Sequence, residues 1–198
     1  MAEPAYDFHH DPDPWPEQGS WTWDDYLRLP EDGQRYEIIH GVLYVSPAPR
    51  YVHQLAVARL VHFLSVFVLG RDLGVVLTAP FDVLLPGVAE PVEPDVLFLK
   101  SGNLPDPAAK NFVGIPDLVV EVLSPSTRRV DLKVKRLAYQ EAGVTEYWIV
   151  DPKLQTVTVY HLDETRHEYR ELGCFQADET VRSKLLEAFE MDVADLFP

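Results

Sequence analysis

The chain contains a single cysteine, Cys174, and no uninterrupted apolar run long enough to cross a membrane. One thiol cannot form an intrachain disulfide or supply the paired cysteines of a structural zinc site. The most apolar segment, residues 55–69, is broken by Arg59 and His62 and is shorter than the ~20 residues of a bilayer span. The acidic, proline-rich N-terminus does not resemble a targeting peptide. We therefore expect a soluble protein of the reducing cytoplasm, without membrane contact.

Positive charge is also scarce. The 198 residues include 17 Lys and Arg against 32 Asp and Glu, a net charge of −15. Such a charge disfavours generic binding to nucleic acid, because neutralisation of phosphates supplies most of the non-specific affinity. One basic island interrupts this pattern, with Arg128, Arg129 and Lys133 as candidate nucleic-acid contacts. A solvated helix face explains the same island equally well.

The length and the 46% content of hydrophobic residues are typical of one globular domain. Residues 1–20 carry four prolines among acidic and histidine residues, which predicts an irregular arm. Residues 21–198 contain no repeat and no composition break. We therefore expect a single domain over 21–198 that follows the arm.

Hydrophobic periodicity predicts alternating helices and strands. The expected helices cover residues 23–29, before Pro30, then 55–69 and 130–142, the last ended by Gly143. A hairpin is expected over 35–45 around His40-Gly41, and loops over 86–94 and 101–116. Further strands are expected at 75–85, 95–99, 118–123, 146–150 and 156–161, and the segment 185–197 is expected to dock on the body.

Two acidic residues accompany the most apolar strands. Glu121 lies within LVVEVL, where an ionised carboxylate is costly unless it has a cation, a proton or hydrogen-bond donors. Asp95 opens the neighbouring strand after Glu93-Pro94, although a turn aspartate would look the same. Asp117 lies four strand residues from Glu121, about 13 Å, which is too far to share an ion with it. Asp95 and Glu121 together are what a hard cation such as Mg²⁺ requires.

Lys135 differs from its basic neighbours in direction. At roughly 100° per residue, Lys135 lies on nearly the opposite side of the helix from Lys133 and Arg136. It could therefore point toward the acidic pair. The alternative is a weak ion pair with Asp131 at the (i, i+4) spacing.

The segment from Glu93 to Pro152, with EPDVLFL and IPDLVVEVLSPSTRRVDLKVKRLAYQEAGVTEYWIVDP, resembles the Uma-two family of restriction endonuclease-like proteins in the PD-(D/E)XK superfamily. The resemblance implies an α/β restriction-endonuclease-like core, a mixed central sheet flanked by helices. It implies Asp95 as the aspartate of the PD motif and Glu121 as its acidic partner. The motif lysine is replaced by Leu123, and Lys135 in DLKVK matches the position from which the family supplies the amine.

The upstream segment RYEIIHGVLYVSPAPRYVH resembles the N-terminal motif of the same family. Glu37 matches the acidic position of that motif and could add a metal or water ligand, although an exposed hairpin charge is an equal alternative. His53 also matches the motif. A lone histidine near a helix start is more often structural, and we do not assign it as a ligand.

These observations favour a Mg²⁺-dependent endonuclease acting on nucleic acid, with DNA as the expected partner and Mn²⁺ as a substitute ion. Asp95, Glu121 and the carbonyl of Val122 would hold the ion, Lys135 would orient the attacking water, and Glu37 would complete the acidic group. The alternative is a non-catalytic nucleic-acid or protein interaction module that kept the fold, which the net charge favours. A hydrolase of smaller phosphate esters is a third reading, and a homodimer is among the oligomeric states left open.

Overall fold

The computed structural model describes residues 15–163 and 165–198, so residues 1–14 of the expected arm lie outside the described residues. The helical elements are α1 (Trp23–Tyr26), α2 (Tyr51–Leu69), the 3-10 turn η1 (Ser101–Asn103), the π-helix η2 (Val130–Lys135), α3 (Arg136–Ala142) and the 3-10 turn η3 (Val193–Leu196). The strands are β1 (Arg35–Ile39), β2 (Val42–Ser46), β3 (Gly74–Thr78), β4 (Asp82–Leu85), β5 (Ala89–Val92), β6 (Val96–Lys100), β7 (Asn111–Val113), β8 (Leu118–Val122), β9 (Glu146–Asp151), β10 (Thr156–Asp163), β11 (Glu168–Phe175), β12 (Thr180–Arg182) and β13 (Glu190–Asp192).

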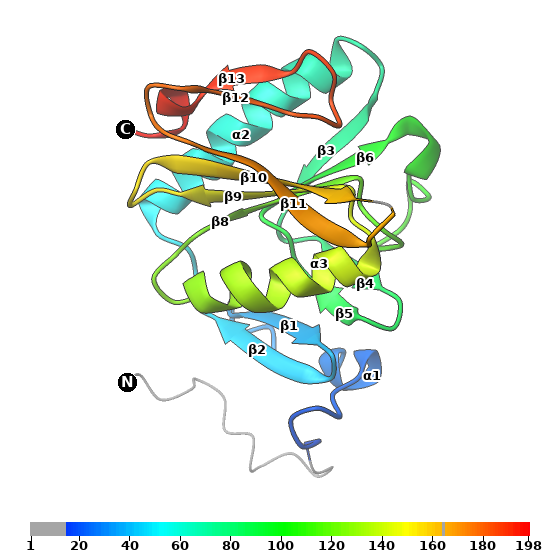
Figure 1. Cartoon of the computed structure of the whole chain (residues 1–198). Coiled ribbons are helices and arrows are strands. Elements are labelled where there is room, and N and C mark those ends of the chain that lie inside the picture. The colour runs from blue at the N-terminus through cyan, green and yellow to red at the C-terminus, as the bar shows by residue number, and fades with distance from the viewer. Residues whose placement is uncertain (1–14, 164) are drawn as a thin grey trace.

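A six-stranded mixed sheet forms the centre of the fold, in the order β11-β10-β9-β8-β6-β3 (Figure 1). Within it β8 and β9 are parallel, and the other neighbouring strands are antiparallel. A smaller sheet has the order β2-β1-β5-β4-β7, and β12 pairs with β13. The predicted α/β fold with a mixed central sheet is confirmed.

Both faces of the central sheet are covered. Helix α2 and the C-terminal segment lie on one face, whereas α3 and the smaller sheet lie on the other (Figure 1). Alternation along β8 sends Val120 and Val122 toward α2 and Val119 toward α3. Strand β8 is therefore buried along its whole length, as its apolar sequence predicts.

Helix α2 begins at Tyr51, four residues before the predicted start. Its 19 residues are long and apolar enough, by length and composition alone, to cross a membrane. One stripe of the helix packs into the core at helical spacing, and its buried apolar members are Ala56, Leu60, Leu64 and Val68. This packing accounts for the apolar stripe, and the absence of membrane contact stays a prediction.

The predicted hairpin forms β1 and β2. His40 and Gly41 connect the strands with φ of 50° and 69°, the left-handed pair of a tight hairpin turn. Residues 15–21 pack beside this turn, where Trp15 stacks on Trp21 with ring centroids 5.3 Å apart. The Gly19 N–H donates to the Gly41 carbonyl at 2.8 Å. A Cβ on Gly41 would lie 2.5 Å from the Gly19 oxygen, so this close approach requires glycine.

The prediction of a single strand over residues 75–85 is wrong. The chain forms β3 in the central sheet and β4 in the smaller sheet, with Pro80 between them. Proline has no backbone N–H to donate to a neighbouring strand, so the sheet pairing of β3 ends before Pro80. The loops expected at 86–94 and 101–116 are also interrupted, because the first contains β5 and the second contains η1 and β7. Strand β11 was not expected, since its sequence carries charges on both faces.

The helix expected over 130–142 forms, but its first six residues adopt the wider π-helical winding. The buried Tyr147 hydroxyl donates to the backbone carbonyl of Asp131 at 3.0 Å. A side chain that enters the backbone ladder in this way is a known cause of helix distortion. Helix α3 then ends at Gly143 with φ of 91°, as predicted.

Glu146 fastens the C-terminal segment to the central sheet. Its side chain is fully buried and accepts hydrogen bonds from the Trp148 indole N–H and the Ser183 hydroxyl, each at 2.7 Å. The backbone N–H groups of Lys184 and Leu185 also donate to it, each at 2.9 Å. The predicted docking of residues 185–197 is confirmed, with Leu186, Phe189, Met191, Val193, Leu196 and Phe197 in the core.

Glu146→Ala should therefore lower the free energy of unfolding by about 3 kcal/mol or more, because it leaves two buried and two partly buried donors without an acceptor. Urea unfolding of this variant beside Glu168→Ala, an exposed residue of β11, would measure the loss. Similar midpoints for the two variants would contradict the role assigned to Glu146.

Candidate active site

The predicted acidic pair lies on adjacent strands. Strands β6 and β8 are antiparallel, with Val96 opposite Val120, so the next position in this register sets Asp95 opposite Glu121. Directly opposed residues of antiparallel strands have Cβ atoms about 4.5–5.5 Å apart. Both side chains are buried, on the face of the sheet that is covered by α3 and the smaller sheet.

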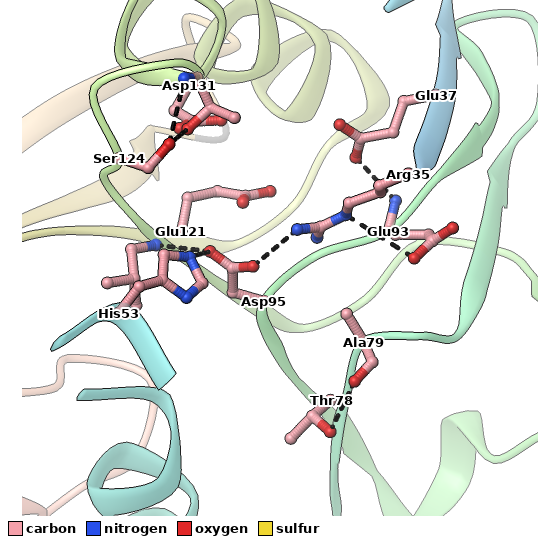
Figure 2. A network of polar contacts seen from close by, with 12 residues as sticks. Arg35, Glu37, His53, Thr78, Ala79, Glu93, Asp95, Glu121, Ser124 and Asp131 are labelled. Atoms are coloured by element: carbon pink, nitrogen blue, oxygen red, sulfur yellow. Dashed lines mark hydrogen bonds and ion pairs between the residues drawn. The ribbon is translucent and has the colours of Figure 1, made fainter. Parts of the chain in front are cut away.

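Asp95 is held by three donors (Figure 2). Arg35 Nη1 lies 2.9 Å from its Oδ1, whereas its Oδ2 accepts from the Val122 N–H at 2.8 Å and lies 3.0 Å from His53 Nε2. Burial alone would raise the pKa of Asp95, but the hydrogen bond from His53 and the charge of Arg35 hold it well below its ordinary value. Asp95 is therefore an ionised carboxylate in a fixed orientation.

Lys135 reaches into this cluster from η2. Its Nζ lies 3.0 Å from Glu121 Oε1 and 2.8 Å from Glu37 Oε1, and the side chain is 3% exposed. Lys133 is exposed, so the predicted difference in direction between the two lysines is confirmed. The alternative contact with Asp131 also exists, but at 3.8 Å it is the longest of the three. The Tyr139 hydroxyl gives Glu121 Oε1 a further donor at 2.7 Å.

Glu37 and Arg35 join the smaller sheet to the central one. Glu37 is buried, so the alternative of an exposed hairpin charge is wrong. Its Oε1 accepts from the Glu93 N–H at 2.9 Å and forms an ion pair with Lys135. Arg35 lies two residues earlier on the same strand face, and its Nε is 3.7 Å from Glu93 Oε2 (Figure 2).

The cluster carries more negative than positive charge. Its five carboxylates, Glu37, Glu93, Asp95, Glu121 and Asp131, face two permanent cations, Arg35 and Lys135. Burial raises the pKa of Glu121 to about 8, that of Glu93 to about 7 and that of Asp131 to about 6, and neighbouring carboxylates add to each shift. The cluster therefore retains protons unless another cation enters.

These residues line a pocket of about 740 Å³. Arg50, His53 and Gln54 at the start of α2 form one wall, and Ser124, Ser126 and Thr127 after β8 form another. His53 is buried, and its Nδ1 has no hydrogen-bond partner among the described residues. The structure thus places His53 in the site, although the sequence alone does not identify this residue as a ligand.

Among the described residues, no three His, Cys, Asp or Glu side chains converge as a ready-made metal site. Lys135 and Arg35 lie among the carboxylates instead. The oxygen donors and the negative excess nevertheless fit Mg²⁺, which is commonly held by one or two carboxylates together with waters. Val122 lies at the site through its N–H, which contacts Asp95, and its carbonyl stays a predicted ligand.

Several site members were missed from the sequence. Arg35 and Glu93 flank predicted residues, and the period-two alternation that places Arg35 beside Glu37 was the available signal. Asp131 was considered only as a partner of Lys135. Asp117 lies outside the cluster, where it pairs with Lys100 at 3.2 Å.

The basic residues proposed to contact nucleic acid all lie on the surface. Arg128, Arg129 and Lys133 are exposed. Arg128 is paired with Asp151 at 2.5 Å, which reduces the positive charge that this island presents.

The raised carboxyl pKa values predict that, without divalent cations, stability falls as the pH rises. A carboxyl with a higher pKa in the folded state stabilises the fold fully below its unfolded value, which is 4.5 for Glu121 and Glu93. That stabilisation is lost as the pH passes the folded values, so the loss should extend from about pH 5 to 8. The lowered pKa of Asp95 acts in the opposite sense, but only in more acidic solution.

Melting temperatures measured in EDTA across this range test the prediction. Glu121→Gln should flatten the decline, whereas Glu168→Gln should leave it unchanged. A melting temperature that rises steadily from pH 5 to 8 in the wild type would contradict it.

Comparison with known proteins identifies the family and the fold of the chain. The model of the Uma2 family, described as "Putative restriction endonuclease", matches residues 23–194. No curated protein matches the chain. A solved structure of a "putative nuclease belonging to DUF820" from Anabaena variabilis ATCC 29413 superposes with a TM-score of 0.74 at 23% identity, over 88% of this chain and 96% of that one.

At that identity the structural likeness shows the fold, whereas the family model covers most of the sequence. Membership of the family supports a nuclease function. The chain belongs to the Uma2 family of restriction endonuclease-like proteins.

Proposed function

We propose that this protein is a metal-dependent nuclease that hydrolyses phosphodiester bonds in DNA, with Mg²⁺ as its cofactor and Mn²⁺ as a substitute. The observation that carries the proposal is the position of Lys135, whose buried Nζ contacts Glu121 beside Asp95. Leu123 occupies the place of the motif lysine and packs into the core instead. An amine from η2 would thus take the part of the lysine that the motif supplies from the strand.

Asp95 and Glu121 would hold the ion, with the Val122 carbonyl as a further ligand. The ion would lower the pKa of a bound water and neutralise charge at the phosphorus. An ammonium has three N–H donors, and two of those of Lys135 are directed at Glu121 and Glu37. The third, whose nearest carboxylate is Asp131 at the longer Nζ–Oδ1 distance of 3.8 Å, would serve the attacking water or a phosphate oxygen, where a buried cation stabilises developing charge most effectively.

A second candidate function is a non-catalytic interaction module that keeps the fold. The observation that favours it is the saturation of Asp95 by Arg35, His53 and the Val122 N–H. A carboxylate with this many donors is stable without a metal. Under this reading Lys135 neutralises Glu121 and Glu37 and does nothing further.

Lys135→Met separates the two candidates. In the nuclease it should lower metal-dependent cleavage on the order of a hundredfold or more, because a group that stabilises transition-state charge is lost. Lys133→Met, which removes an exposed lysine of the same helix, should change the rate little. Both variants would be assayed on single- and double-stranded DNA and RNA with Mg²⁺ or Mn²⁺, with folding checked by circular dichroism.

Equal activity of the two lysine variants would exclude Lys135 as the catalytic lysine. Complete inactivity of the wild type on every nucleic acid, with Glu121→Gln as the background control, would favour the interaction module.

Metal binding can be measured directly. Asp95→Asn should bind Mn²⁺ at least about tenfold more weakly than the wild type in isothermal titration, because it removes an anionic oxygen ligand. Asp117→Asn is the matched control, since Asp117 lies outside the cluster and pairs with Lys100. Mg²⁺ should also raise the melting temperature of the wild type, as any ligand of the folded state does. Equal Mn²⁺ affinities for Asp95→Asn and the wild type would contradict the assignment.

A further inference from the structure

The groups that would react lie deep in the pocket. The side chains of Asp95, Glu121 and Lys135 are 5%, 2% and 3% exposed, whereas Pro47, Pro49 and Ser126 of the same pocket are exposed. The volume of about 740 Å³ is typical of a site for one small molecule, for which roughly 300–1,000 Å³ is usual. Proteins that read intact DNA instead contact it along an extended surface. A phosphate must therefore leave the surface and enter the pocket to react.

Such an entry is far easier for an unpaired strand. A nucleotide of a duplex must break its stacking and pairing before it can enter a pocket, and this cost is smallest for a strand that is already single. Electrostatic repulsion also favours an unpaired strand over a duplex. A duplex carries twice the charge per length of one strand, and a chain of net charge −15 repels it accordingly.

The pocket-lining residue Arg50 and its chain neighbour Tyr51 suit a single strand. Arg50 lines the pocket, and Tyr51 follows it at the start of α2 with its side chain 75% exposed. Of the aromatic side chains that the structure describes, Tyr51 is the one that is mostly exposed. An exposed aromatic ring beside a cation is the usual arrangement for stacking an unpaired base and holding its backbone.

Inside the pocket, His53 offers a further polar atom. Its side chain is 9% exposed, and its Nδ1 has no hydrogen-bond partner among the described residues. Buried polar atoms in native proteins are nearly always hydrogen-bonded, so an atom of this kind that lines a pocket indicates a place for a ligand or water.

We propose that this pocket takes an unpaired nucleic-acid strand, either a single strand or a frayed end, and that continuous duplex is a poor substrate. Tyr51 stacks on a base at the mouth, and Arg50 contacts the phosphate beside it. The inference rests on the proposed nuclease function and names the form of substrate that the same site accepts.

Fluorescence anisotropy with a labelled 20-nucleotide DNA, as a single strand and as a duplex of the same sequence, tests the inference. Ca²⁺ would be present because it takes the same oxygen ligands as Mg²⁺. The single strand should bind at least about tenfold more tightly than the duplex. Tyr51→Ala and Arg50→Ala should each weaken single-strand binding by about tenfold.

The opposite end of α2 provides matched controls. Leu69→Ala and Arg71→Ala remove an exposed apolar side chain and an exposed cation there, and both should bind the single strand like the wild type. Duplex affinity equal to or above that of the single strand would overturn the inference. An unchanged affinity in Tyr51→Ala would overturn the part assigned to that residue.

A small chromogenic diester, bis(p-nitrophenyl) phosphate, separates this inference from the function on which it rests. Its Mn²⁺-dependent hydrolysis by the wild type, and not by Asp95→Asn, would support the nuclease chemistry without any strand. If the ester is hydrolysed but both DNA forms are cut equally, the strand preference alone is wrong. If neither the ester nor any nucleic acid is cut, the proposed function fails, and the anisotropy measurement still decides the preference.

Discussion

The fold depends on the burial of opposite charges between its two large sheets. Lys135 contacts Glu37 of β1 and Glu121 of β8, and Arg35 of β1 contacts Asp95 beside β6. Each cation therefore links elements that are far apart in the sequence. An ionised carboxylate in this position is costly without such a partner, so the ion pairs that orient the site also fix the smaller sheet and η2 against the central sheet.

The cost of this arrangement supports a use for it. Buried ion pairs are often no more stabilising than well-packed apolar residues of similar size, and the raised pKa values of Glu121 and Glu93 show that the cluster is not fully compensated. The π-helical winding of η2 is a second local departure, and such turns occur frequently at functional sites. The Tyr147 hydroxyl donates to the Asp131 carbonyl within that winding. The incompletely compensated charge and the π-helical winding thus both occur at residues that position Lys135.

The parts of this structure that could be predicted from the sequence follow from local residue patterns. The His40-Gly41 turn, the Gly143 helix end and the apolar strand around Glu121 each follow from a few adjacent residues. The division of 75–85 between two sheets could not be read locally, because both halves have the same strand composition and only tertiary pairing separates them. The pairing of Arg35 with Asp95 joins residues 60 apart, and it required the two sheets to be placed first.

The charge of the cluster sets the order of events in the proposed reaction. Two cations among five carboxylates leave an excess of three negative charges when all are ionised, and this excess repels a phosphate. With a divalent cation bound at Asp95 and Glu121, as proposed, the excess would fall to one. In the proposed reaction, metal binding would therefore favour substrate entry. In a chain of net charge −15, phosphate binding would therefore depend on this local reduction of negative charge and on contact with Lys135, not on long-range attraction.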